Sequence, residues 1–153
     1  MTYSDGPCLL AEIQRPRLAT LDDVDSLVQF GYLFVAASPY KDVGLDEDAV
    51  RGVITHLITN ESGVIFISDG GFIAGALTPL FFQPSVIIAA ELAWYAPGAG
   101  GTKLREVFED WARDNNAAAT QMNTLNNEFA ASLSSNLVEN GYTPVEVSYI
   151  KAL

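Results

Sequence analysis

The spacing of hydrophobic residues changes between two periods along the chain, and this change predicts a fold of helices and strands. Apolar residues three or four positions apart predict helices with one buried face over Leu21–Val28 and Val50–Ile58. Short apolar runs, typical of buried strands, flank these two segments. The predicted strands are Ile13–Leu18, Val64–Ser68, Phe72–Phe82, Val86–Tyr95 and Ala118–Leu125. Residues 1–12 are then a lead-in, and residues 13–153 are expected to form a single domain.

Capping and turn residues predict where these elements begin and end. Thr20 followed by Asp23 is a capping box, which predicts that the first helix starts there. Asp69-Gly70-Gly71 predicts a hairpin between the strands on either side of it. Pro84-Ser85 predicts a turn that leads into the strand beginning at Val86.

The last thirty residues predict one more helix and a closing strand. Phe129, Leu133 and Leu137 are spaced four apart, and Asn126 or Asn127 is expected to cap this helix. Gly141 is expected to end it in the left-handed conformation. Val145, Val147 and Tyr149 alternate with other residues, which predicts a strand over Tyr142–Leu153.

A strand, a glycine-rich turn and a helix follow one another in the middle of the chain. The strand Val86–Tyr95 runs through Pro97 and three glycines into a helix whose apolar residues recur with a period of 3.6. The unpaired amides and the dipole of such a helix N-terminus attract anions. Lys103 and Arg105 lie in its first turns, where acidic residues are the usual choice, and an anionic ligand would explain them. A surface helix with a tight entry turn remains the alternative interpretation.

Composition excludes several classes of function. The 153 residues include 19 acidic and 8 basic side chains, a net charge of −11 that disfavours nucleic acid and anionic membranes as partners. Apolar runs are too short to cross a bilayer, and no signal sequence is recognised. A single cysteine, Cys8, suits a reducing cytoplasm. A single histidine, His56, argues against a metal site or a histidine-based catalytic triad.

Five stretches of the sequence, taken in order, resemble the GCN5-related N-acetyltransferase (GNAT) family, in particular its small bacterial and phage-encoded members. They are RPRLATLDDVDSL, SDGGFIAGAL, AAELAWY, KLREVFEDWARDNNA and LVENGYTPVEVSYIKAL. The resemblance implies an α/β fold with a mixed, mostly antiparallel sheet of six or seven strands and about four helices on its two faces. It also implies a location in the cytoplasm, or in a virion if the chain is phage-encoded.

The resemblance further implies acetyl-CoA as the co-substrate, held between the strand that ends at Tyr95 and the strand that begins near Ala118. The implied cofactor-binding residues belong to the first of these strands, to the glycine turn, to the first helical turn and to a later loop. They are Leu92, Ala93, Trp94, Tyr95, Gly98, Ala99, Gly100, Gly101, Thr102, Lys103 and Asn127. No metal is expected.

Transfer of an acetyl group to an amine needs a base, and Glu91 is the candidate for it. Glu91 is a lone carboxylate in an apolar strand, where burial would raise its pKa toward a useful value. A solvated strand end or an ion pair with a neighbouring strand would equally explain it. The resemblance places the oxyanion donor among the backbone amides near Leu92 or Ala93. It places an acceptor pocket near Phe30, Ser38 and Tyr40, although a turn with one packing aromatic explains these residues too.

Three residues depart from the family pattern and keep a second function open. Ala96 and Ala99 stand where the family's pyrophosphate loop has glutamine or arginine and then glycine. Leu137 stands where family members have the tyrosine that protonates the leaving thiolate. The chain is therefore expected to be an acetyl-CoA-dependent N-acetyltransferase acting by direct transfer to a small-molecule or protein amine. The alternative is an inactive protein of the same fold, used in binding or in virion assembly. In either case a homodimer or a subunit of an assembly is a candidate oligomeric state.

Overall fold

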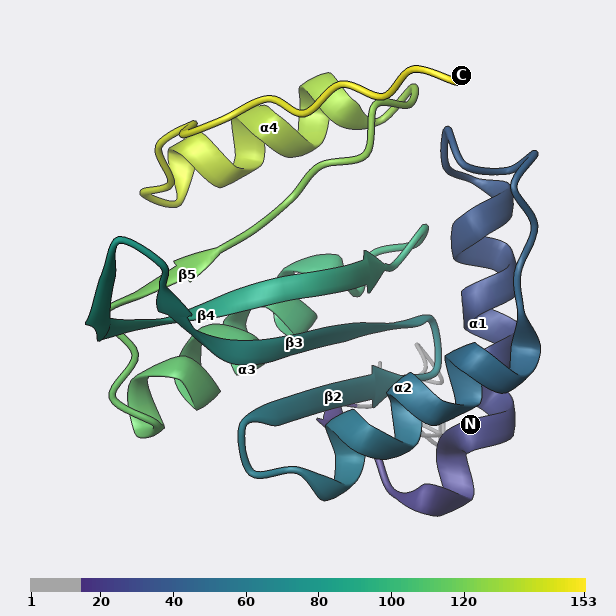
Figure 1. Ribbon diagram of the computed structural model, residues 1–153, viewed down its shortest axis with the longest axis horizontal. Coiled ribbons are helices and arrows are strands. Elements are labelled where there is room, and N and C mark those ends of the chain that lie inside the picture. The colour runs from purple at the N-terminus through teal and green to yellow at the C-terminus, as the bar shows by residue number, and fades with distance from the viewer. Residues whose placement is uncertain (1–14) are drawn as a thin grey trace, which may run out of the picture. The chain divides into compact units, whose positions relative to one another are not determined.

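A five-stranded sheet organises the larger of two compact units in the chain. The computed structural model describes residues 15–153 (Figure 1), and the two units divide between Asn123 and Thr124. The strands follow one another across the sheet in chain order, the first four antiparallel and the last parallel to its neighbour. They are β1 (Arg17–Leu18), β2 (Gly63–Ser68), β3 (Gly71–Leu80), β4 (Gln83–Tyr95) and β5 (Ala119–Gln121). This confirms a mixed, mostly antiparallel sheet, with five strands instead of six or seven.

The three longer helices of this unit are α1 (Val24–Ala36), α2 (Glu47–Thr59) and α3 (Gly101–Asp114). A short 3₁₀ turn, Leu21–Asp23, leads into α1, and the capping box at Thr20 is present as predicted. The Asp23 carboxylate accepts the Thr20 N–H at 2.8 Å and two hydrogen bonds from the Arg17 guanidinium, also at 2.8 Å. The hydrogen bonds from Arg17 hold the pKa of Asp23 well below its usual range. Asp46 caps α2 by accepting the Ala49 N–H at 3.0 Å.

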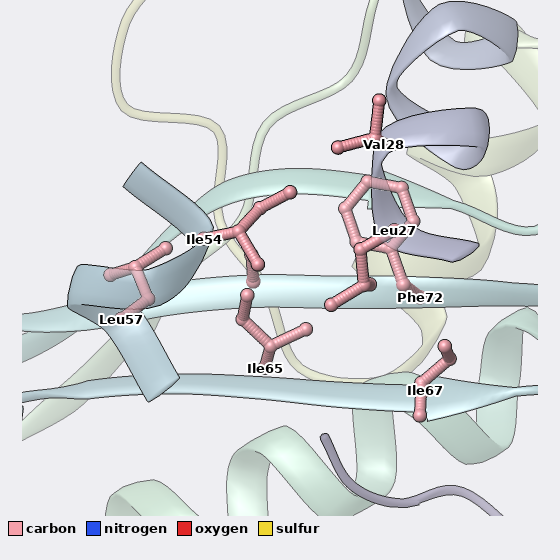
Figure 2. Close-up of a cluster of buried hydrophobic side chains, with 8 residues drawn as sticks. Leu27, Val28, Ile54, Leu57, Ile65, Ile67 and Phe72 are labelled. Carbon is pink, nitrogen blue, oxygen red and sulfur yellow. The ribbon is translucent and has the colours of Figure 1, made fainter. Parts of the chain in front are cut away.

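Two hydrophobic cores lie on the opposite faces of the sheet. The first joins α1 and α2 to β2 and β3, and Figure 2 shows Ile54 of α2 pointing toward Ile65 of β2. The second core lies under α3, where Leu104 and Phe108 are fully buried against the other face. Burial of these stripes is what keeps the helices on the sheet, because isolated helices of this length are marginal in water.

The turn between β3 and β4 differs from the sequence prediction. Phe81 and Phe82 form the two-residue tip of the hairpin, between the paired residues Leu80 and Gln83, so the turn precedes Pro84-Ser85 instead of using it. The two rings lie edge to face at 5.1 Å and are 92% and 71% exposed. Sequence reasoning placed these phenylalanines inside a strand because their hydrophobicity resembles that of a buried run.

The smaller unit, Thr124–Leu153, contains α4 (Ala130–Glu139). Gly141 has the left-handed conformation predicted for it, with φ of +91°. The helix begins later than expected: Asn127 accepts the Phe129 N–H at 3.0 Å and so caps the turn just before α4. The predicted strand over residues 142–153 is wrong, because this segment contains no strand and its alternating side chains are exposed. Across residues 15–153, none of the helices has the length and hydrophobicity needed to cross a membrane.

Replacement of Gly75 by alanine should destabilise the fold, because α3 packs directly on this glycine. A Cβ atom there would lie 2.5 Å from the Phe108 ring and 2.7 Å from the Ala90 carbonyl oxygen. Overpacking of this kind costs about 1–3 kcal/mol, to be measured by urea denaturation. Gly52→Ala is the matched control. Gly52 lies inside α2 with nothing within 4 Å of the added atom, so its replacement should stabilise by about 0.5–1 kcal/mol. Equal effects of the two changes would contradict this packing.

Candidate active site

A β-bulge in β4 changes which face of the sheet its side chains occupy. The neighbours Ala74 and Gly75 of β3 pair with Ala93 and Glu91 of β4, so Leu92 is an extra residue without a partner. Ala89 packs in the core under α3, whereas Ala93 packs against the core under α1 and α2. Regular alternation would have kept both on one face. The bulge therefore falls at the residues for which the sequence predicts catalysis.

The strands β4 and β5 part at the same point. Their parallel pairing covers Ile88 to Ala90 of β4 and ends at Gln121 of β5, while β4 continues to Tyr95. Along this last stretch β4 has β3 as its sheet neighbour on one side and no strand on the other, within the described part of the chain. The backbone of Leu92 and Ala93 therefore has no strand neighbour on that side among the described residues, and the predicted cofactor position there stays a prediction.

Glu91 is buried at the parting of the two strands and is bound there by Asn123. The Glu91 residue is 5% exposed, and its Oε2 accepts the Asn123 backbone N–H at 2.9 Å and the Asn123 Nδ2 at 3.1 Å. Nδ2 also donates to the Glu91 carbonyl oxygen at 3.0 Å. Burial raises the pKa of Glu91 to about 7, and the two hydrogen bonds from Asn123 oppose that rise. The other oxygen, Oε1, accepts no hydrogen bond from the described residues, which leaves it able to accept a proton.

The N-terminus of α3 follows β4 after a short turn that includes Gly98 and Ala99, both exposed. Gly100 is the N-cap and supplies no side-chain hydrogen bond to the first turn, and Gly101 is the first helical residue. Thr102 and Lys103 are exposed in that first turn. The turn therefore presents backbone amides without a side-chain cap next to one lysine.

Arg105, the second basic residue noted near this helix start, does not face solvent. It is 3% exposed, and its guanidinium is bound to Glu109 one turn later. Its Nε and the Nε1 of Trp94 are buried without a hydrogen-bond partner among the described residues. The Trp94 ring lies under Gly101, where an added Cβ would contact it at 3.5 Å. The exposed positive charge of the first turns therefore comes from Lys103 and not from Arg105.

The predicted acceptor residues have local structural roles. Phe30 packs against Phe72 and Tyr95, with ring centroids 5.9 and 6.2 Å away. Ser38 is buried, donates to the Val35 carbonyl oxygen at 2.8 Å and accepts the Tyr40 N–H at 3.1 Å. The hydrogen bonds of Ser38 close the end of α1, whereas Phe30 packs from the middle of that helix. Their role in substrate binding stays a prediction, as does that of Asn127, which belongs to the smaller unit.

Two features of the site were not found by sequence reasoning. Asn123 is 32 residues away from Glu91, and only the parallel register of β5 brings it near. The other feature is a cavity of about 630 Å³ between α2 and the sheet, which His56 and Leu92 both line. The spacing of hydrophobic residues in α2 predicts which of its side chains are buried. It does not predict that residues on another side of the helix line a cavity. Within residues 15–153, no group of acidic, histidine or cysteine residues is arranged to hold a metal ion.

Comparison with known proteins shows the fold of acetyltransferases. No protein-family model matches the sequence, and no curated protein matches it either. Among solved structures, an Arthrobacter sp. FB24 protein described as an acetyltransferase has a TM-score of 0.69 at 19% identity, over 94% of this chain and 98% of that one. AAC(6')-Iy, solved with the bisubstrate analogue CoA-S-monomethyl-acetylneamine, has a TM-score of 0.68 at 14% identity. The match covers 90% of this chain and 97% of that one. A Clostridium acetobutylicum protein described as a predicted acetyltransferase, with acetyl-CoA, has a TM-score of 0.66 at 13% identity, with 90% and 94% covered. The chain thus has the GNAT fold expected from its sequence.

Stability should depend on pH through Glu91, with a sign set by its raised pKa. The folded protein keeps the proton up to pH about 7, whereas the unfolded chain releases it near 4.5. Folding stability contributed by this group is therefore present below about pH 4.5 and is lost as pH rises to 7 and beyond. The difference between the two pKa values corresponds to a change of about 3 kcal/mol in the free energy of unfolding, at 1.36 kcal/mol per pKa unit.

Glu91→Gln removes this titration and should gain stability relative to the unmodified protein as pH rises from 4.5 to 8. Urea denaturation across that range measures the difference between the two proteins. Parallel stability profiles would show that Glu91 is not desolvated in the folded state.

Proposed function

We propose that the protein is an acetyl-CoA-dependent N-acetyltransferase that transfers an acetyl group directly to an amine. The observation that carries this proposal is the parting of β4 from β5 at the Leu92 bulge, beside a buried carboxylate whose pKa is about 7. The likeness to acetyltransferase structures supports the fold, and the residues at this point supply the chemistry.

The N-terminus of α3 fits the diphosphate of coenzyme A. Amides at Gly100, Gly101 and Thr102 have no side-chain cap, and a Cβ on Gly98 would meet nothing within 4 Å, so an anion has room to approach. Lys103 adds a positive charge, and the helix dipole favours a negative ligand there. When bound, acetyl-CoA supplies the acetyl group as an activated thioester.

Backbone amides of β4 would stabilise the charge that develops on the acetyl oxygen. Leu92 and Ala93 lie where β4 has left β5, so amides directed to that side have no sheet partner within the described residues. Fixed backbone donors of this kind need no reorganisation during the reaction. Trp94 and Tyr95, which follow, would border the same opening from opposite faces of the sheet.

Glu91 would take the proton from the attacking amine. The amine nitrogen forms a C–N bond with the acetyl carbon as the C–S bond breaks, and the ammonium proton passes through a water to Oε1 of Glu91. A carboxylate with a pKa of about 7 is well matched to this task near neutral pH. Asn123 would hold the carboxylate in place through Oε2.

The leaving thiolate would take its proton from solvent. Leu137 occupies the position at which the sequence resemblance leads one to expect a tyrosine, and an aliphatic side chain cannot donate a proton.

An inactive protein with this fold is the competing hypothesis, and it predicts neither acetyl-CoA binding nor acetyl transfer.

Charge reversal at Lys103 should separate cofactor binding from stability. Lys103→Glu should weaken acetyl-CoA binding about tenfold in calorimetric titration, because it replaces a favourable charge beside the diphosphate with a repulsive one. The same change should leave the unfolding free energy equal or higher by about 0.3–1 kcal/mol, because an acidic residue complements the helix dipole.

Lys41→Glu is the matched control, since Lys41 is also exposed but lies between α1 and α2. It changes the net charge equally and should leave the affinity within about twofold. Equal weakening by both variants would point to net charge alone. Absence of heat up to millimolar acetyl-CoA, together with absence of acetyl transfer, would favour the inactive alternative.

Replacement of Glu91 by glutamine should lower turnover and spare cofactor binding. Loss of a general base lowers kcat by about 10²–10⁴-fold, while the Kd for acetyl-CoA should not change. The kcat/KM of the unmodified protein should rise with pH through about 7, as Glu91 loses its proton. A parallel loss of turnover and of acetyl-CoA affinity would instead assign Glu91 a structural role.

A further inference from the structure

A groove of about 630 Å³ runs between α2 and the sheet, on the face that also carries α1. Its helical wall includes Gly52, Val53 and His56, and its strand wall includes Leu77 and Leu92. Val53 and Leu92 are each 55% exposed, although both are large and apolar. The volume lies within the roughly 300–1,000 Å³ of small-molecule sites.

The groove reaches the point where β4 leaves β5. Leu92, the extra residue of the bulge, forms part of its wall, and it directly follows Glu91 in the chain. A molecule lying in the groove therefore reaches the β4 backbone where the acetyl group is proposed to lie.

The walls of the groove carry no formal charge. None of the eleven lining residues is aspartate, glutamate, lysine or arginine, although the chain as a whole has a net charge of −11. His56 is the one titratable side chain among them, and Asn60 and Ser62 near the end of α2 supply the other polar side chains. A ligand with several ammonium groups would have to desolvate them here without carboxylate partners, which is costly.

We infer that this groove binds the acceptor, and that the acceptor is a primary amine with an uncharged, apolar body. The inference rests on the proposed function, and it names the substrate class for it. The apolar body lies along Val53 and Leu92, and the single amino group lies at the Leu92 end, where β4 leaves β5. Polyamine sugars such as neamine are disfavoured because the walls offer them no carboxylate.

Filling the groove from its helical side tests the location. Gly52 has open space at its Cβ position, and leucine is a better helix former than glycine, so Gly52→Leu should fold and project into the groove. With 2-phenylethylamine as probe and no cofactor, calorimetry on the full chain should show binding that Gly52→Leu weakens about tenfold or more. Gly52→Ala keeps the groove open and should bind within about threefold of the unmodified protein. Unchanged binding in Gly52→Leu, or no binding to the unmodified protein, would overturn the inference.

A charge placed on the groove wall tests the substrate class. The unmodified protein should acetylate 2-phenylethylamine with a kcat/KM about tenfold or more above that for neamine, measured by thiol release and by product mass. Val53→Asp should lower the ratio of the kcat/KM for 2-phenylethylamine to that for neamine by about tenfold. An exposed carboxylate in the groove attracts the polycationic neamine and disfavours the apolar body of 2-phenylethylamine. A preference of the unmodified protein for neamine would overturn the inference.

The two arms separate this inference from the proposed function. Failure of the proposed function appears as no acetyl-CoA binding and no acetylated product with any amine. Failure of the groove assignment appears as acetyl-CoA binding in a protein whose affinity for 2-phenylethylamine does not respond to Gly52→Leu.

Discussion

The site depends on one constraint in the sheet: β4 must pair with β3 to its end, yet leave β5 after three residue pairs. The extra residue at Leu92 reverses the alternation of side chains along β4. Ala89, before it, packs in the core under α3, and Ala93, after it, packs against the core under α1 and α2. The two hydrogen bonds from Asn123 to Glu91 Oε2 hold the strands together where the pairing stops. The buried place of Glu91 and the exposed place of Leu92 both follow from this local change in register.

Sequence reasoning recovered the elements whose signals are local. The capping box at Thr20, the hairpin at Asp69-Gly70 and the left-handed Gly141 all depend on a few neighbouring residues, and all are present. Features that depend on distant partners were missed or wrong. The alternation at Val145 and Val147 predicted a strand, but a strand also needs a partner, and nothing in an alternating pattern supplies one.

The candidate site shows the same division. Glu91 could be chosen from its sequence, because a lone carboxylate in an apolar strand is unusual and burial shifts its pKa in a known direction. Its partner could not, because Asn123 is one of several asparagines, and parallel pairing alone distinguishes it. Charge in the sequence also misled in one place. Arg105 suggested an anion ligand, yet in the structure it is buried with Glu109.

The hairpin tip at Phe81 and Phe82 belongs to a stretch with no charged residue between Asp69 and Glu91. Among residues 15–153, β3 has no strand neighbour on its outer side beyond Leu77, since its pairing with β2 ends at Ala76. An uncharged arm with a free edge is the kind of surface on which chains associate edge to edge. Pro79 and Pro84 flank the tip and cannot donate a backbone hydrogen bond. These two prolines, and not charged side chains, thus protect the uncharged hairpin against aggregation. Elsewhere on this acidic protein, charge is the expected protection.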